Sequence, residues 1–267
     1  MTTERPLALI TGASAGIGEA FARALASRNH DLILVARRID RLRELCATLE
    51  SKHAITATAA QIDLSEPGAV KHLVSQLPQQ AVDLLINNAG YGVPGAFSSS
   101  TWETHHKFQQ VMINSVAELC WHIAPMMQSR GRGQIINIAS LAGLIPAVAG
   151  HTLYAASKSW MIQFTRSLAA ELHPSGVKCI AICPGFTYSE FHDVTGTRDS
   201  VEKLPKWMWL SSEAVVEESL RVIESSSKVV HVTGRVNRVL DSLANSLPRS
   251  WAYALAKRHG NSARDSS

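Results

Sequence analysis

Short apolar runs recur along residues 6–183, and each is followed by a stretch whose apolar residues have helical spacing. Turn residues bound the runs, which are too short for helices of their own, so each run predicts a buried strand. Strands that alternate with helices form a parallel sheet with right-handed crossovers. The pattern predicts an α/β fold with three layers and a doubly wound parallel sheet. The expected strands are residues 6–10, 31–36, 55–62, 82–86, 134–139, 177–183 and, less regularly, 228–233.

Length and composition favour one large domain. The 267 residues are 46% hydrophobic and 18% charged, a balance typical of a folded globular protein. The N-terminus is typical of a first strand and not of a signal peptide, and no apolar run of about eighteen residues predicts a transmembrane segment. We therefore expect a single domain over residues 1–267 in a cytoplasmic protein.

Neither the cysteines nor the charges indicate a metal or nucleic-acid site. The four cysteines are scattered without metal-ligand spacing, so we expect reduced, mostly buried thiols and no metal. The net charge is +4, and residues 228–267 hold seven Lys or Arg against two Asp. No stacking aromatics or nucleic-acid motif accompany these charges. They predict a solvated basic C-terminal extension at about 235–267 and no nucleic-acid partner.

The first strand leads into a glycine-rich turn. Residues 11–18 are Thr-Gly-Ala-Ser-Ala-Gly-Ile-Gly, and a helical pattern follows. Glycine lets the backbone approach a ligand, and the helix N-terminus offers N–H groups that suit a pyrophosphate. A tight turn without a ligand is the alternative. With the sheet pattern, the turn predicts a Rossmann fold with dinucleotide contacts from Gly12, Ser14, Ala15, Gly16, Ile17 and Gly18.

The second and third strands end where such a fold places the adenosine. Ala36 is followed by Arg37 and Arg38, whose guanidinium groups suit a 2′-phosphate better than ribose hydroxyls. We therefore expect NADP(H) to be preferred over NAD(H). In the alternative interpretation, both arginines only begin the basic helix at 39–49 and face water. Asp63, after the third strand, is placed to contact an adenine.

Tyr154 and Lys158 form a Tyr-x-x-x-Lys pair on an expected helix. Residues four apart share a helix face, so the ammonium is expected to approach the phenol and lower its pKa. Ser140 follows the fifth strand at the ligand-binding end of the sheet. Asn114 interrupts the long helix expected at 101–129. Asn is a poor residue inside a helix, so its position indicates a bend, a water site or a catalytic role.

The ordered motifs over residues 7–189 resemble those of the classical short-chain dehydrogenase/reductase family. They are Thr11-Gly12-x-x-x-Gly16-x-Gly18, Asn87-Asn88-Ala89-Gly90, Asn114, Ser140, Tyr154-x-x-x-Lys158 and Pro184-Gly185. The resemblance implies a catalytic tetrad of Asn114, Ser140, Tyr154 and Lys158. It implies further cofactor contacts from Leu64, Asn88, Ala89, Gly90, Tyr154, Lys158, Pro184, Gly185, Thr187 and Ser189. In these roles Ser140 holds the substrate oxygen, Tyr154 is the general acid or base, and Lys158 binds the nicotinamide ribose.

Two departures from the family pattern bear on function. Ser140 and Tyr154 are fourteen positions apart, one more than is commonest, so the substrate-side loop at 144–153 carries an insertion. Ser189 replaces the usual threonine after Pro-Gly, and its hydroxyl can still bond the nicotinamide carboxamide.

The expected function is an NADP(H)-dependent oxidoreductase that transfers a hydride between nicotinamide and a carbonyl or secondary alcohol. Reduction is the expected direction. Residues 92–100, 144–153 and 186–212 are expected to line a hydrophobic substrate pocket, with 186–212 as a lid. Two alternatives are an epimerase or dehydratase of the extended type and a nucleotide-sensing regulator. The resemblance also implies a homodimer or homotetramer.

Overall fold

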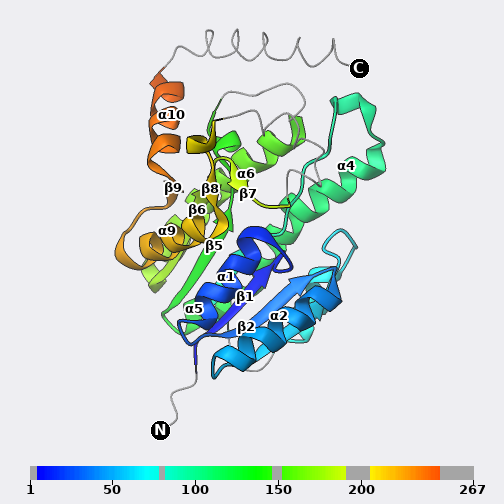
Figure 1. Ribbon diagram of the computed structural model, residues 1–267, viewed down its shortest axis with the longest axis vertical. Helices are drawn as coiled ribbons and strands as arrows, with labels where there is room; N and C mark the ends of the chain where they lie inside the picture. The colour runs from blue at the N-terminus through cyan, green and yellow to red at the C-terminus, as the bar shows by residue number, and fades with distance from the viewer. Residues whose placement is uncertain (1–4, 78–81, 146–151, 191–204, 247–267) are drawn as a thin grey trace.

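The computed structural model describes residues 5–77, 82–145, 152–190 and 205–246. Its centre is a parallel sheet in the order β3-β2-β1-β4-β5-β6-β9, flanked by helices on both faces (Figure 1). This is the predicted doubly wound fold. The strands of this sheet are β1 (Leu7–Thr11), β2 (Asp31–Ala36), β3 (Ala57–Gln61), β4 (Leu84–Asn87), β5 (Gly133–Ile138), β6 (Val177–Cys183) and β9 (Val230–Val232).

Two apolar layers hold the helices against the sheet. Alternate residues of a strand point to opposite faces, and in β1 Ile10 packs in one layer and Leu9 in the other. Helices α1, α2 and α9 cover the Ile10 face, and α3 and α5 cover the Leu9 face. The helices are α1 (Gly16–Ala26), α2 (Ile39–Lys52), α3 (Ala69–Ser75), α4 (Trp102–Gln109), α5 (Ser115–Ser129), α6 (Thr152–Leu172), α9 (Ser212–Ser225) and α10 (Arg235–Ser246).

Strand order reverses beside β1, which pairs with β2 on one side and β4 on the other. In open α/β sheets, the carboxyl ends of strands at such a point border the ligand crevice. The glycine turn follows β1 and the Asn88-Ala89-Gly90 segment follows β4, so the topology brings both predicted motifs to this edge.

The long helix expected at 101–129 is divided by a π-helical turn. Thr101 caps α4 by accepting a hydrogen bond from the Thr104 N–H (3.2 Å), and the π turn Gln110–Asn114 follows before α5 begins. The Asn114 amide donates to the Gln110 side chain at 2.8 Å. Because π turns insert an extra residue, the helix changes its phase at Asn114. The structure therefore gives Asn114 a place in the backbone change, and the water site and the catalytic role stay predictions.

The chain after β6 forms a second, small sheet. Strand β7 (Thr187–Tyr188) pairs with β8 (Leu210–Ser211), and the Tyr188 ring stacks on buried Trp209 at 4.7 Å. Residues 191–204 of the predicted lid, most of the insertion loop at 144–153 and residues 247–267 of the predicted basic extension lie outside the described residues. The lid and the extension therefore stay predictions.

Candidate active site

The glycine turn is packed against the segment that follows β4. The Thr11 hydroxyl accepts hydrogen bonds from the N–H groups of Asn88 and Ala89, both at 3.0 Å, and the Asn88 amide donates to the carbonyl oxygens of Thr11 (3.0 Å) and Gly12 (3.2 Å). A Cβ on Gly18 would lie 2.3 Å from the Gly12 oxygen. The turn therefore admits only glycine there, and the Asn88 side chain ties two strand ends together.

The first turn of α1 is open to an anion. Gly16, with a φ of 57°, begins the helix, and its N-cap residue Ala15 offers no side-chain cap for the N–H groups. Ile17 packs partly into the apolar layer under the sheet. Ser14 lies beside this turn, and the Arg38 guanidinium donates to its hydroxyl at 3.1 and 3.0 Å. Uncapped N–H groups, a hydroxyl and a guanidinium are donors that suit phosphate oxygens.

The two arginines after β2 lie in different surroundings. Both are exposed, but Arg38 joins Ser14 beside the helix N-terminus, whereas Arg37 lies near the Asp63 carboxyl. Burial would raise the pKa of Asp63, but hydrogen bonds from Ser65 and the charges of Arg37 and Lys107 outweigh it and lower that pKa. The next residue, Leu64, is buried. This places Arg38, rather than Arg37, closest to the glycine turn.

The Pro184-Gly185 turn connects the catalytic side to the glycine turn. The Leu141 N–H donates to the Pro184 oxygen at 2.9 Å, and the buried Thr187 hydroxyl donates to the Gly185 oxygen at 3.1 Å. Ser189 lies over the glycine turn, where its Cβ would be 3.0 Å from a Cβ on Gly16. The chain thus passes from the substrate side to the phosphate side within a few residues.

Ser140, Tyr154 and Lys158 meet at the end of β5. The Ser140 hydroxyl accepts a hydrogen bond from the Ala142 N–H at 3.1 Å, and a side-chain hydrogen bond joins Ser140 to Tyr154. The buried Lys158 ammonium donates to the Ile138 oxygen at 2.7 Å and lies 5.8 Å from the centroid of the Tyr154 ring. The expected proximity of the three side chains is confirmed.

The expected lowering of the Tyr154 pKa is wrong for this structure. Burial raises the pKa of Tyr154 to about 12, and its hydrogen bond with Ser140 opposes that rise only in part. Burial also lowers the pKa of Lys158 to about 8. Sequence spacing showed that the two groups share a helix face, but it did not show how far both are removed from water. The Tyr154 phenol is therefore protonated at neutral pH.

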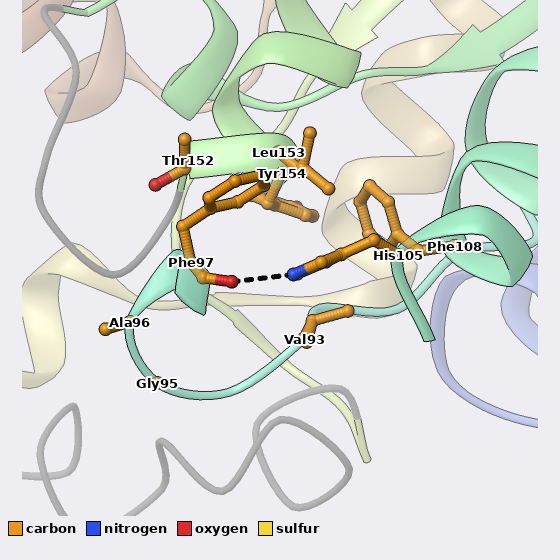
Figure 2. A pocket seen from close by; sticks show the side chains of 9 residues that line it. All are labelled: Val93, Gly95, Ala96, Phe97, His105, Phe108, Thr152, Leu153 and Tyr154. Atoms are coloured by element: carbon orange, nitrogen blue, oxygen red, sulfur yellow. Dashed lines mark hydrogen bonds between the residues drawn. The ribbon is translucent and has the colours of Figure 1, made fainter. Parts of the chain in front are cut away.

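A small apolar pocket adjoins Tyr154. Figure 2 shows the Tyr154 and Leu153 side chains facing the 93–97 loop and α4. His105 lies in this wall, stacked on Phe97, and its Nε2 is 2.8 Å from the Phe97 carbonyl oxygen. A carbonyl oxygen only accepts, so Nε2 carries the proton. The pocket is lined by Val93, Gly95, Ala96, Phe97, His105, Phe108, Thr152, Leu153 and Tyr154.

The groups at the carboxyl edge of the sheet fit a nicotinamide dinucleotide. They are the glycine turn, the uncapped first turn of α1 and the Ser140, Tyr154 and Lys158 side chains. The family model for short chain dehydrogenases matches residues 6–199. The chain belongs to this family. It is therefore an oxidoreductase that acts on CH–OH or C=O groups with a nicotinamide cofactor.

Named members of the short-chain dehydrogenase family cover most of this chain. The ketoacyl reductase HetN of Nostoc sp. is 34% identical over 198 residues, 73% of this chain and 68% of the relative. The NADP-dependent 3-hydroxy acid dehydrogenase YdfG of Salmonella typhi is 35% identical over 189 residues, 67% of this chain and 71% of the relative. A short-chain dehydrogenase of Sphingobium yanoikuyae, solved in complex with NADPH, has a TM-score of 0.80 at 29% identity and covers 91% of this chain and 96% of its own.

The described residues contain neither a candidate metal site nor a candidate membrane-spanning helix. Within the ranges that the structure describes, no group of three or more His, Cys, Asp or Glu side chains could hold a metal ion. No helix in those ranges is long and apolar enough to span a bilayer. All four cysteines are described, and each is buried as a free thiol.

Proposed function

We propose that this short-chain dehydrogenase is an NADP(H)-dependent reductase of hydrophobic carbonyl compounds. The observation that carries the chemistry is the hydrogen bond between Ser140 and Tyr154, with the buried Lys158 ammonium beside the same ring. The nicotinamide cofactor, when bound, supplies the hydride that adds to the carbonyl carbon. The side chains of this protein supply the proton and hold the charge.

Tyr154 is the proton donor in this proposal. A pKa of about 12 keeps the phenol protonated at neutral pH, so it can give its proton to the carbonyl oxygen as that oxygen gains charge. Ser140 donates a hydrogen bond to the same oxygen, and the Lys158 ammonium stabilises the phenolate left behind. Asn114, at the end of the π turn, holds a water through which Tyr154 regains its proton. This role of Tyr154 favours the reductive direction, because the phenol is protonated before the reaction.

The preference for NADP(H) rests on Arg38. Its guanidinium lies beside the Ser14 hydroxyl and the uncapped N-terminus of α1, which together offer donors for a 2′-phosphate. Two similar proteins point the same way, since YdfG is named as NADP-dependent and the Sphingobium enzyme was solved with NADPH. Thr187, beside Gly185, lies on the part of the segment that would face the nicotinamide end, whereas Ser189 lies over the glycine turn.

The hydrophobic substrate is inferred from the pocket beside Tyr154. Val93, Phe97, Phe108 and Leu153 are among its wall residues, and such side chains favour apolar groups on the carbon chain of a ketone or aldehyde.

Calorimetric titration of NADPH and NADH tests the cofactor preference. Wild type should bind NADPH more tightly by about 1 to 3 kcal/mol, and Arg38→Ala should remove most of that difference. Arg37→Ala, near Asp63, should have a smaller effect. Arg43→Ala is the matched control, because Arg43 is an exposed arginine of α2 whose nearest acidic partner is Asp40 at 3.9 Å. Equal affinity of wild type for both cofactors would contradict the preference.

A further inference from the structure

Arg38 and Arg41 hold a carboxylate of this chain beside the glycine turn. The Glu190 Oε2 atom lies 2.7 Å from Arg38 Nη1, and its Oε1 atom lies 2.6 Å from Arg41 Nη1. Arg38 bonds the Ser14 hydroxyl at the same time, through Nε and Nη2. Glu190 is thus seated among the donors that the proposed function assigns to a 2′-phosphate.

The backbone before Glu190 is fixed by the small sheet and not by these ion pairs alone. The Ser212 hydroxyl donates to the Tyr188 carbonyl oxygen at 3.1 Å, and Tyr188 stacks on Trp209. Ser189 then packs against Gly16. Because these contacts already hold the two preceding residues, Glu190 loses little conformational entropy when its carboxylate binds the arginines.

The carboxylate is charged at neutral pH. Hydrogen bonds from Arg38 and Arg41 lower the pKa of Glu190 below its ordinary value. A carboxylate and a phosphate compete for the same guanidinium donors, and two anions at one site repel each other. The arginines cannot give the same N–H groups to both.

We propose that Glu190 is a specificity-determining residue for the cofactor, because its carboxylate occupies the Ser14, Arg38 and Arg41 donors and a 2′-phosphate has to displace it. Glu190 therefore lowers the affinity for the phosphorylated dinucleotide and changes the affinity for the unphosphorylated one little. This inference rests on the proposed role of Arg38. Arg41 enters the site with it, although no sequence pattern indicates that this residue of α2 lies there.

The test is calorimetric titration of the full chain carrying Glu190→Gln, which keeps the size of the side chain and removes its charge. The ligands are NADPH, NADH, adenosine 2′,5′-bisphosphate and adenosine 5′-monophosphate. NADPH and the bisphosphate should bind about two- to tenfold more tightly than to wild type, the range for exposed ion pairs. NADH and the monophosphate should change by less than about twofold.

Glu213→Gln is the matched control. Glu213 lines the same groove beside α1 as Glu190, and the described residues show no arginine paired with it. Its affinities should match those of wild type. In the double variant Arg38→Ala with Glu190→Gln, the gain for NADPH should shrink, because Glu190 acts through the guanidinium groups.

Three results would overturn the inference. Unchanged NADPH affinity in Glu190→Gln would make the ion pairs ordinary surface contacts. Weaker NADH binding in the same variant would mean that Glu190 binds the ribose hydroxyls. If Arg38→Ala does not weaken NADPH binding, both the proposed NADP(H) site and the role of Glu190 are wrong. If Arg38→Ala weakens NADPH binding and Glu190→Gln has no effect, only the role of Glu190 is wrong.

Discussion

The Lys158 ammonium nitrogen lies 5.8 Å from the centroid of the Tyr154 ring, one helical turn along α6. Lys158 is buried and Tyr154 is partly buried, and burial moves their pKa values apart, to about 8 for Lys158 and about 12 for Tyr154. Each shift favours the uncharged form of its group. The site therefore keeps the Tyr154 phenol protonated and holds the Lys158 ammonium at a cost in stability.

Lys158→Met is expected to stabilise the protein while it removes activity. Lowering the pKa of Lys158 from 10.5 to about 8 costs about 3 kcal/mol at neutral pH. Methionine fills a similar volume without a charge, so the free energy of unfolding at pH 7 should rise by about 1 to 3 kcal/mol. Urea denaturation of wild type and variant measures the difference.

The difference in stability between wild type and Lys158→Met should depend on pH. Between about pH 8 and 10.5 the unfolded state of wild type binds more protons at Lys158 than the folded state, so wild type gains stability relative to the variant as pH rises. The advantage of Lys158→Met should shrink across this window. A constant difference from pH 7 to pH 10 would mean that Lys158 is not desolvated as the structure shows.

Asn114→Ala should lose activity without loss of fold. The π turn that ends at Asn114 packs against α6, which carries Tyr154, and the proposed function gives its amide the water that returns a proton to Tyr154. We expect a roughly 10- to 100-fold fall in turnover with unchanged circular dichroism. Gln110→Ala removes the hydrogen-bond partner of Asn114 but keeps the Asn114 amide, so turnover should fall less than in Asn114→Ala. Near-normal turnover in Asn114→Ala would leave the residue with only its part in the π turn.

Gly18→Ala should disrupt the glycine turn. The new methyl would lie 2.3 Å from the Gly12 oxygen and 2.6 Å from the Asn88 amide nitrogen, neither of which can move freely. We expect a loss of roughly 1 to 3 kcal/mol in stability, together with weaker cofactor binding. Gly90→Ala is the control, because its methyl would meet the flexible Met112 side chain at 3.0 Å. Equal melting temperatures of the two variants would contradict this account.

Substrate preference should follow apolar size. A series of methyl ketones with lengthening alkyl chains should show kcat/KM rising about threefold to fourfold per methylene until the pocket is filled. Phe97→Ser should flatten this series, since Phe97 is a wall residue of the pocket that stacks on His105. A series that is flat in wild type would count against a hydrophobic substrate.

The strands were most predictable where the sequence was continuously apolar. Residues 31–36 and 177–183 form β2 and β6 with the expected bounds, because both strands are buried on both faces. The third strand is shorter than expected, as Ala57–Gln61 instead of 55–62. It lies at the sheet edge, where one neighbour and partly exposed alanines give a weak apolar signal.

The sequence predicted which motifs meet but not what surrounds them. Asn88, Ser140, Tyr154 and Lys158 were found from local patterns, and helix and strand geometry then brings them together. Glu190 and Arg41 are 149 positions apart, and no pattern in the sequence relates them. The same limit explains the wrong expectation for the Tyr154 pKa, because burial depends on the whole fold.

In the proposed reaction, Tyr154 protonates a carbonyl that receives a hydride from the nicotinamide. NADPH deuterated at C4, used separately as the R and S forms, should leave one deuterium on the carbinol carbon of a reduced hydrophobic ketone with one form only. Mass spectrometry of the product measures this. Tyr154→Phe should bind NADPH normally and form the deuterated alcohol roughly 100-fold or more slowly. Deuterated product formed by Tyr154→Phe at near the wild-type rate, or no deuterium in the product of wild type with either form, would contradict the account.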